Sequence, residues 1–370
     1  MRAAMRVPLM PIPLSAARRV LGARGRILNL ADAALPGEAA LLTDVVFGLQ
    51  RTKIAGVLVS SGMADALGQN SRTPLDLARE LELDPDMTVR VVDAAVAFRL
   101  MRLDGRGRAR LTKMGAPLRR DHPKSLASWV AYYAHPDTAA AHAHFDAQLR
   151  EGTESSGYKR TFGKSLWEYF DDHPDVGATF TDAMRQLTEI DLAGVVRAYP
   201  WPRRGVICDV AGGIGHMLAA ILDHRPNARG VLLDSREVIE QAEEYLRERG
   251  LSDRVERRTG NLFGELNAHA DVYTMKWILH DWGDEACRDI LKRVRATMPS
   301  GSKLVTIDFH HESGRPNAST TLGDILMLAC CEGGRERSPH EVHDLMRAAG
   351  LTPGRVRHNG LTMLVEGVAP

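Results

Sequence analysis

The sequence has little of several residue classes, and each shortage excludes a class of protein. Its 370 residues include four cysteines, at 208, 287, 330 and 331, and no Cys-x-x-Cys pair. This excludes a disulfide scaffold and a zinc ribbon, and it fits a reducing cytoplasm. Only 5% of the residues are aromatic, so stacking platforms cannot be abundant. Because 48 basic residues face 47 acidic ones, the chain is not a polycation built to coat nucleic acid or an anionic membrane.

Long apolar runs are also absent, since no stretch of about 18 uncharged apolar residues occurs that could span a bilayer. What is present is an ordinary globular composition, 44% hydrophobic and 26% charged. The length predicts about two domains. Residues 1–31 hold six arginines and no acid, and prolines interrupt their only apolar stretch. We interpret this segment as a basic arm, either mobile or contacting a second subunit.

The next part of the chain predicts a winged helix. Apolar residues recur at helical spacing over 38–68, and Thr73-Pro74 is typical of a helix start. A second apolar stripe follows over 89–100, and Asp104-Gly105 predicts a hairpin. A winged helix could bind DNA, but its second helix lacks the Asn, Gln and Lys that read base edges. We therefore favour a dimerisation scaffold over a DNA-binding module.

Residues 126–190 gather many of the aromatic side chains, which could form ordinary core or line a pocket for a flat organic substrate. A break follows at Tyr199-Pro200-Trp201-Pro202. Strands and helices then alternate to the end of the chain, which predicts a doubly wound, mostly parallel α/β sheet. The expected strands are 206–210, 231–234, 255–259, 270–276 and 303–309, with helices at 216–224, 237–249, 284–297 and 339–349 and closing strands within 353–369.

A glycine turn links the first strand of this sheet to its helix. Such a turn brings backbone N–H groups and a helix N-terminus close to a bound cofactor. The dinucleotide fingerprint is met only in part, because Leu218 stands where the third glycine belongs. The segment Asp209-Val210-Ala211-Gly212-Gly213-Ile214-Gly215 instead resembles the first motif of S-adenosylmethionine-dependent methyltransferases. Asp234 ends the second strand 19 positions after Gly215, where a carboxylate accepts ribose hydroxyls in either cofactor class.

Two further motifs make the resemblance specific. Leu279-His280-Asp281-Trp282-Gly283-Asp284-Glu285, preceded by Lys276, resembles the signature of plant-type small-molecule O-methyltransferases, which include caffeate-type enzymes and antibiotic-tailoring relatives in bacteria. Gly333-Gly334-Arg335-Glu336-Arg337-Ser338 resembles the late motif of that family. The resemblance runs from about residue 40 to near the end. It implies a C-terminal Rossmann-like doubly wound methyltransferase domain behind a mainly helical winged-helix dimerisation domain, and S-adenosyl-L-methionine as cofactor.

The predicted organisation is a basic arm (1–31), a winged-helix dimerisation domain (32–120), a helical region lining the substrate pocket (121–200) and a methyltransferase domain (201–370). His280 is the natural base for a phenol, since its reference pKa is near neutrality. The family pattern places Glu336 and Asp308 beside it. The family often has Glu where this chain has Asp308, so the carboxylate there is one methylene shorter.

The resemblance also assigns binding residues. Asn261 stands where the family usually has Asp and still offers an acceptor oxygen, and Lys276 is expected near the adenine or ribose. We take Asp281 and Trp282 as structural and packing residues. The cofactor set is Asp209, Gly212, Gly213, Asp234, Asn261, Leu262, Phe263 and Lys276; the acceptor set is Phe180, Met184, Trp167, Asp324 and Met327.

The sequence thus predicts a cytoplasmic homodimeric enzyme that methylates a phenolic or polyketide-like hydroxyl in antibiotic or other secondary metabolism, with no metal, nucleic acid or membrane partner. One alternative keeps the fold but uses the bound cofactor for rearrangement or hydroxylation without methyl transfer. Asn261 and Asp308 leave this alternative open, whereas His280 and Glu336 favour methylation. A second alternative is a winged-helix regulator that senses a small molecule, which would show salt-dependent DNA retention.

Overall fold

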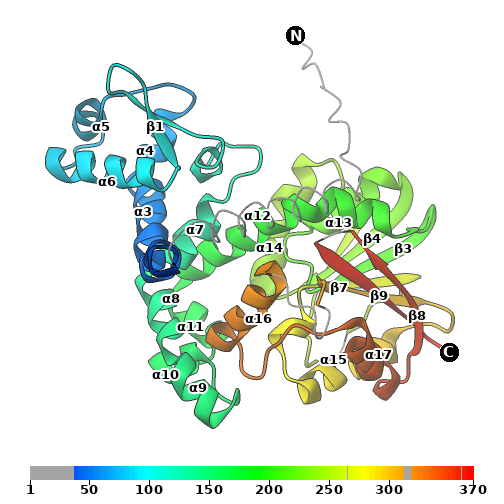
Figure 1. Ribbon diagram of the computed structural model, residues 1–370. Helices are drawn as coiled ribbons and strands as arrows, with labels where there is room; N and C mark the ends of the chain where they lie inside the picture. The colour runs from blue at the N-terminus through cyan, green and yellow to red at the C-terminus, as the bar shows by residue number, and fades with distance from the viewer. Residues whose placement is uncertain (1–36, 265, 312–317, 360) are drawn as a thin grey trace, which may run out of the picture. The chain divides into compact units, whose positions relative to one another are not determined.

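The computed structural model describes residues 37–264, 266–311, 318–359 and 361–370 (Figure 1). The basic arm predicted over 1–31 lies outside these residues. Internal contacts divide the chain into two units, 1–49 and 50–370. In the first unit, α2 (Gly37–Ala40) leads into a π-helical turn, η1 (Leu41–Val46). Leu41, Leu42, Val45 and Val46 of that turn expose about half or more of their surface.

The helical part of the second unit follows the predicted winged-helix order. The apolar stripe expected over 38–68 does not form one helix. α3 (Gly48–Ser60) ends before Gly62, which adopts φ 77°, and α4 (Met63–Leu67) is a separate helix. Thr73 caps α5 (Pro74–Glu80) and Asp84 caps α6 (Pro85–Ala97), each by accepting a backbone N–H. β1 (Met101–Leu103) and β2 (Ala109–Leu111) form the antiparallel hairpin.

A second helical group carries the aromatic residues. Its helices are α7 (Ala127–Ala134), α8 (Pro136–Ala141), η3 (His142–His144), α9 (Phe145–Glu151), α10 (Gly157–Phe162), α11 (Leu166–Asp172) and α12 (Pro174–Ala198), after the 3-10 turn η2 (Ala116–Leu118). Tyr132, Tyr158 and Tyr169 are buried in one cluster with Met327 and Cys330 of α16 (Ala318–Cys330). The aromatic residues therefore pack against a helix from the far end of the chain.

The C-terminal part is a seven-stranded sheet in the order β5-β4-β3-β6-β7-β9-β8. β3 through β7 are parallel, and β9 runs antiparallel to both neighbours. The strands are β3 (Arg204–Val210), β4 (Asn227–Asp234), β5 (Val255–Thr259), β6 (Val272–Lys276), β7 (Lys303–Phe309), β8 (Thr352–His358) and β9 (Thr362–Val368). The predicted α/β fold is confirmed.

Helices cover both faces of this sheet (Figure 1). α13 (His216–His224) and α14 (Arg236–Glu248) bury apolar side chains against one face. α15 (Asp284–Thr297) and α17 (Pro339–Ala348) cover the other. Because consecutive parallel strands end at the same edge, the segments after β3, β4, β6 and β7 meet at one carboxyl edge, where open α/β sheets bind their ligands.

Candidate active site

His280 lies at the carboxyl edge of the sheet, four residues after the end of β6. It sits in a 3-10 turn, η4 (Leu279–Asp281), and only 8% of the residue is exposed. Leu279, in the same turn, is buried in the hydrophobic core of the sheet and anchors the turn there. Arg337 braces the same turn, because its guanidinium donates to the carbonyl oxygens of Leu279 and Trp282 at 2.6 and 2.7 Å. The imidazole is thus held on a rigid segment.

Glu336 is the direct partner of this imidazole. Its Oε1 lies 2.7 Å from Nδ1 of His280, and the glutamate side chain is fully buried. Its Oε2 has no hydrogen-bond partner among the described residues. Burial acts to lower the pKa of His280, but the facing carboxylates of Glu336 and Asp281 outweigh it and raise that pKa above its ordinary value. The structure therefore brings together two of the three residues predicted for catalysis.

The third predicted residue, Asp308, stands nearby without a hydrogen bond to the ring. It lies near the end of β7 and is 4% exposed, and its Oδ1 has no hydrogen-bond partner among the described residues. Burial raises the pKa of Asp308 to about 7. Asp281, interpreted from the sequence as a structural residue, faces the ring, with Oδ1 3.4 Å from Nε2 of His280. The histidine is therefore surrounded by three carboxyl groups.

The loop that carries Glu336 approaches the histidine turn closely. The backbone N–H of Arg335 donates to the carbonyl oxygen of His280 at 2.8 Å. A Cβ on Gly334 would stand 2.8 Å from that same oxygen, so only glycine permits this approach. Arg337 also pairs with Asp284 at 2.8 Å. Sequence reasoning missed the bracing role of Arg337, although the residue stands inside the late motif that it singled out.

The glycine turn and Asp234 form a second cluster at the same edge. Oδ2 of Asp234 accepts the backbone N–H of Gly213, and Oδ1 accepts that of Ser235, at 2.8 and 2.7 Å. Gly213 has φ 59°, in the region that favours glycine. A Cβ on Gly212 would stand 2.7 Å from the carboxyl group of Asp209. The turn therefore lies directly over the end of β3.

Asp209 supplies a buried carboxyl group under this turn. Its Oδ1 accepts from Thr274 Oγ1 at 2.7 Å, while Oδ2 has no hydrogen-bond partner among the described residues. Burial raises the pKa of Asp209 to about 7. An unpartnered oxygen at this depth is costly, so it is an observation that calls for a ligand or another compensating group.

The remaining predicted cofactor residues lie on two further segments. Oδ1 of Asn261 accepts the backbone N–H of Phe263 at 2.8 Å. Phe263 is 40% exposed and meets the Trp282 ring edge-on at 4.8 Å, whereas Leu262 packs against the sheet core. These side chains form a partly open apolar surface beside the histidine turn.

Lys276 ends β6 in a buried polar network. Its ammonium lies 3.6 Å from Oδ1 of Asp191 and donates to Oγ1 of Thr188 at 3.3 Å. It also stands over the ring of Trp277. Burial lowers the pKa of Lys276 to about 7, partly offset by Asp191. The lysine is thus engaged with α12 and its own strand, a set of contacts that the sequence did not indicate.

The predicted acceptor residues are spread over the aromatic helices and α16. Phe180 meets the rings of Tyr132 and Trp167 at 5.2 and 6.1 Å. Trp167 is 37% exposed, and Met184 is half-buried on α12. Met327 belongs to the same cluster. Asp324 differs from the rest, because its Oδ1 accepts the backbone N–H of Glu336 at 2.8 Å.

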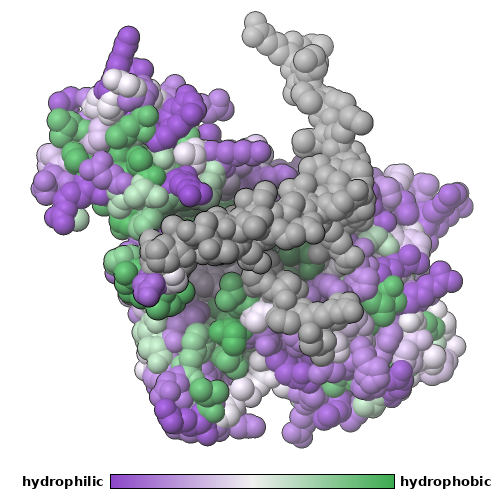
Figure 2. Space-filling model, viewed as in Figure 1, coloured by the Kyte–Doolittle hydropathy of each residue, from purple (hydrophilic) through white to green (hydrophobic). Residues whose placement is uncertain are grey.

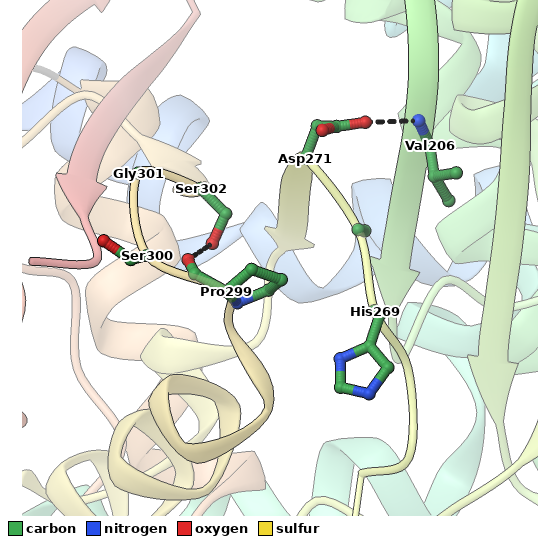
Figure 3. Close-up of a pocket in the computed structure, with 8 residues that line it drawn as sticks. Val206, His269, Asp271, Pro299, Ser300, Gly301 and Ser302 are labelled. Carbon is green, nitrogen blue, oxygen red and sulfur yellow. Dashed lines mark hydrogen bonds between the residues drawn. The ribbon is translucent and has the colours of Figure 1, made fainter.

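The opposite, amino edge of the sheet carries a surface depression of about 430 Å³ (Figure 3). Val206 of β3 and the residues just before β6 and β7 line it, including His269, Asp271 and Ser302. Oδ2 of Asp271 accepts the backbone N–H of Val206 at 2.8 Å, and Ser302 Oγ donates to the carbonyl oxygen of Pro299. Asp271 and Ser302 thus have hydrogen-bond partners within the lining, and the depression lies at the opposite edge of the sheet from His280.

Two absences hold for the residues that the structure describes. No group of three or more His, Cys, Asp or Glu side chains there is arranged to hold a metal ion. No helix in the described ranges is long and apolar enough to cross a membrane.

Comparison with known proteins identifies the family. The model of the O-methyltransferase domain matches residues 142–352. The chain is 32% identical to the O-demethylpuromycin-O-methyltransferase of Streptomyces alboniger, over 87% of this chain and 86% of the relative. It is also 32% identical to the mitomycin biosynthesis 6-O-methyltransferase of Streptomyces lavendulae, over 85% and 91%. Some relatives methylate nitrogen, such as the 8-amino-8-demethylriboflavin N,N-dimethyltransferase of Streptomyces davaonensis, at 27% identity over 81% and 87%.

Solved structures agree with this assignment. A mitomycin 7-O-methyltransferase superposes with a TM-score of 0.82 at 29% identity, covering 92% of this chain and all of that one. An O-methyltransferase from neocarzinostatin biosynthesis, solved with S-adenosylmethionine and 2-hydroxy-5-methyl naphthoic acid, gives 0.74 at 28% identity, over 86% and 96%. The chain therefore belongs to the O-methyltransferase family and is an S-adenosylmethionine-dependent O-methyltransferase of the kind that serves antibiotic and secondary-metabolite biosynthesis.

Proposed function

We propose that this enzyme methylates a phenolic or polyketide-like hydroxyl of a secondary metabolite and that His280 is its general base. The observation that carries the proposal is the 2.7 Å contact between Nδ1 of His280 and Oε1 of Glu336 in a buried setting. Relatives named for an aromatic hydroxyl support it, such as the 2,7-dihydroxy-5-methyl-1-naphthoate 7-O-methyltransferase of Streptomyces carzinostaticus. A hydroxyl must lose its proton to become a good nucleophile, and a positioned base supplies that step.

The bound cofactor supplies an activated methyl group, so the protein has to align the acceptor and remove its proton. Glu336 holds Nδ1–H of His280, which leaves Nε2 to accept the proton of the acceptor hydroxyl. Asp281, 3.4 Å from Nε2, stabilises the imidazolium that results. Because the carboxylates raise the pKa of His280, the neutral base is favoured on the alkaline side and turnover should rise with pH.

The carboxyl edge fits the cofactor that this chemistry needs. Asp209 offers a buried oxygen without a hydrogen-bond partner among the described residues, and the glycine turn lies over it. Asp234, at the end of β4, would accept the ribose hydroxyls. Asn261 would accept a hydrogen bond from the adenine amino group, and Leu262 and Phe263 would lie on the faces of the ring. Lys276 would stand close by. In this proposal, Gly212 and Gly213 would bring backbone N–H groups to the methionine end.

A flat acceptor would enter beside the aromatic cluster. Phe180 and Trp167 contact one another there, and Trp167 remains 37% exposed. Met184 and Met327 add adaptable apolar surface. Rings and thioethers of this kind suit an aromatic acceptor, since they bind by area and stacking more than by hydrogen bonds.

We further propose a homodimer made through the helical N-terminal region, with residues 121–200 lining the acceptor pocket and 201–370 holding the cofactor. The apolar side chains of η1 support this, because they are about half exposed or more. Exposed apolar patches of this kind mark interaction surfaces. Light scattering would show the mass of two chains, and charged substitutions at Leu42 and Val45 would reduce it to one.

The central experiment replaces His280 with Ala. We expect turnover to fall about 10²- to 10⁴-fold, because a positioned base contributes that much, while S-adenosylhomocysteine binding measured by calorimetry stays unchanged. His269→Ala is the matched control, an exposed histidine at the amino edge of the same sheet. Wild-type turnover in His280→Ala would contradict the proposed base. A wild-type product without the mass gain of one methyl group would favour non-methylating chemistry.

A further inference from the structure

Three backbone N–H groups of the loop that carries Glu336 donate hydrogen bonds to other segments of the chain. Two of them join backbone groups, from Gly333 N–H to the carbonyl of Thr153 at 3.0 Å and from Arg335 N–H to the carbonyl of His280 at 2.8 Å. The third uses a side chain, since Oδ1 of Asp324 accepts the backbone N–H of Glu336 at 2.8 Å. Of these three bonds, the third is the one that a side-chain substitution removes, because its acceptor is a carboxylate and not a backbone carbonyl.

The third bond acts on the residue that touches the histidine. The side chain of Glu336 adopts only a few staggered rotamers. Its carboxylate therefore reaches Nδ1 of His280 only when the Cα is held at the right place. α16 passes close to this carboxyl group, because a Cβ built on Gly323 would stand 3.9 Å from Oε1 of Glu336 and the same distance from Phe309. The ring of Phe309 in turn lies 6.3 Å from that of His280.

We propose that Asp324 is a positioning residue that anchors the backbone of Glu336 and so keeps its carboxylate on Nδ1 of His280. The inference rests on the proposed function, because the anchored pair has catalytic meaning only if His280 is the base. It also assigns Asp324 a task other than the acceptor contact expected from the sequence. Since α16 carries Met327 as well, one helix joins the acceptor pocket to the catalytic pair.

Three segments packed against His280 each contribute a carboxyl group that affects its charge. Glu336 faces it from the late loop, Asp281 from its own turn and Asp308 from β7. If the anchor of Glu336 is lost, its carboxylate moves away and the imidazole loses its strongest charged partner. The pKa of His280 then falls, by about one unit for a carboxylate withdrawn from contact.

The test compares Asp324→Ala with Asp324→Asn and Asp271→Ala. Asn keeps an acceptor oxygen and should behave as wild type. Asp271 offers a matched control, because it accepts the N–H of Val206 at the same 2.8 Å but at the amino edge (Figure 3). The readout is an NMR titration of the His280 imidazole in protein without cofactor or acceptor, assigned with His280→Gln.

We expect Asp324→Ala to lower the pKa of His280 and to reduce kcat about 10- to 100-fold, as expected for a misplaced catalytic group, with S-adenosylhomocysteine affinity unchanged. If Asp324→Ala does not fold, Asp324→Ser is too short to replace the bond and serves instead. An unchanged His280 titration in a folded variant, or an equal shift in Asp271→Ala, would overturn the inference. Failure of His280→Ala to lose turnover would instead reject the proposed function and leave the titration result standing.

Discussion

The two edges of the sheet both carry acidic side chains and a histidine, but these differ in burial and in hydrogen bonding. At the amino edge, Asp271 and His269 are exposed, and each has a backbone partner. At the carboxyl edge, Asp308 and Glu336 are buried, and each keeps one oxygen without a hydrogen-bond partner among the described residues. A buried polar group without a partner costs stability, so its retention marks a place where the fold serves chemistry.

This difference also explains why the depression at the amino edge is not the candidate site. A hollow shows where atoms are absent, whereas chemistry needs groups whose protonation or hydrogen bonding is unsatisfied. The depression at the amino edge has partnered polar groups (Figure 3). The space-filling view shows hydrophilic and hydrophobic residues mixed over the coloured part of the face that it draws (Figure 2).

The largest difference between the two edges is expected when Glu336 is removed. We expect Glu336→Ala to lower kcat about 10²- to 10³-fold, because the imidazole loses both its orientation and the charge that stabilises its protonated form. The pH-rate profile should also move its acid limb to lower pH, since the pKa of His280 falls without that carboxylate. Turnover under saturating cofactor and acceptor across the pH range is the measurement.

Glu341 provides the control for this prediction. It lies in the first turn of α17, where it forms a capping box with Ser338, and it pairs with Arg335 at 2.7 Å. Glu341→Ala should cost stability while leaving the acid limb in place. An acid limb that stays fixed in Glu336→Ala would contradict the assignment of Glu336 as partner of the base.

A smaller effect is expected from Asp234. Its carboxylate accepts two backbone N–H groups and would accept ribose hydroxyls as well. Asp234→Ala should weaken S-adenosylhomocysteine binding about 10- to 100-fold, the loss of hydrogen bonds to a charged group. Calorimetric titration measures this loss, with Asp271→Ala as the control from the amino edge. Equal affinities for the two variants would remove the distinction between the edges.

The smallest effect concerns stability and pH. Burial raises the pKa of Asp308 to about 7, from 3.8. Between these values Asp308 keeps its proton in the folded state but loses it in the unfolded state. Its contribution to the free energy of unfolding therefore falls as pH rises from about 4 to 7. Asn cannot ionise, so the stability of Asp308→Asn relative to wild type should be roughly 1–3 kcal/mol higher at pH 8 than at pH 5, from about 1.4 kcal/mol per pH unit up to the raised pKa. Urea unfolding at both values tests this.

Asp271→Asn is the matched control for the stability measurement. Asp271 is an exposed aspartate, so this variant measures what the same replacement does outside the buried edge. The interpretation of Asp308 as a buried acid would be wrong if Asp308→Asn changed the unfolding free energy equally at pH 5 and pH 8.

Much of the local structure followed from the chain itself. Thr73-Pro74 and Asp104-Gly105 predicted a capped helix and a hairpin, and both are present. The helix expected at 216–224 and the strand expected at 303–309 have those bounds. These signals are local: caps, turn residues and apolar periodicity act within a few positions. Gly62 showed the limit, since one left-handed residue divides an apolar stripe into two helices.

The candidate site was foreseen in part. Resemblance named His280 and Glu336, and the structure places them in contact across 56 positions of sequence. It did not indicate that Asp281 faces the ring, or that Lys276 is engaged by Asp191. Lys276 and Asp191 are far apart in the chain, and the orientation of Asp281 depends on the geometry of a short 3-10 turn. The periodicity of the sequence indicates neither.

The sequence alone determined the family, the strand and helix order, and which residue types were available at the carboxyl edge. Only the tertiary structure decided which carboxylates are buried, which oxygens are left without partners, and that Asp324 holds the backbone of Glu336 rather than standing apart from it. The physical reason is that side-chain identity is a local property of the chain. Burial and pKa arise from everything the fold packs around that side chain.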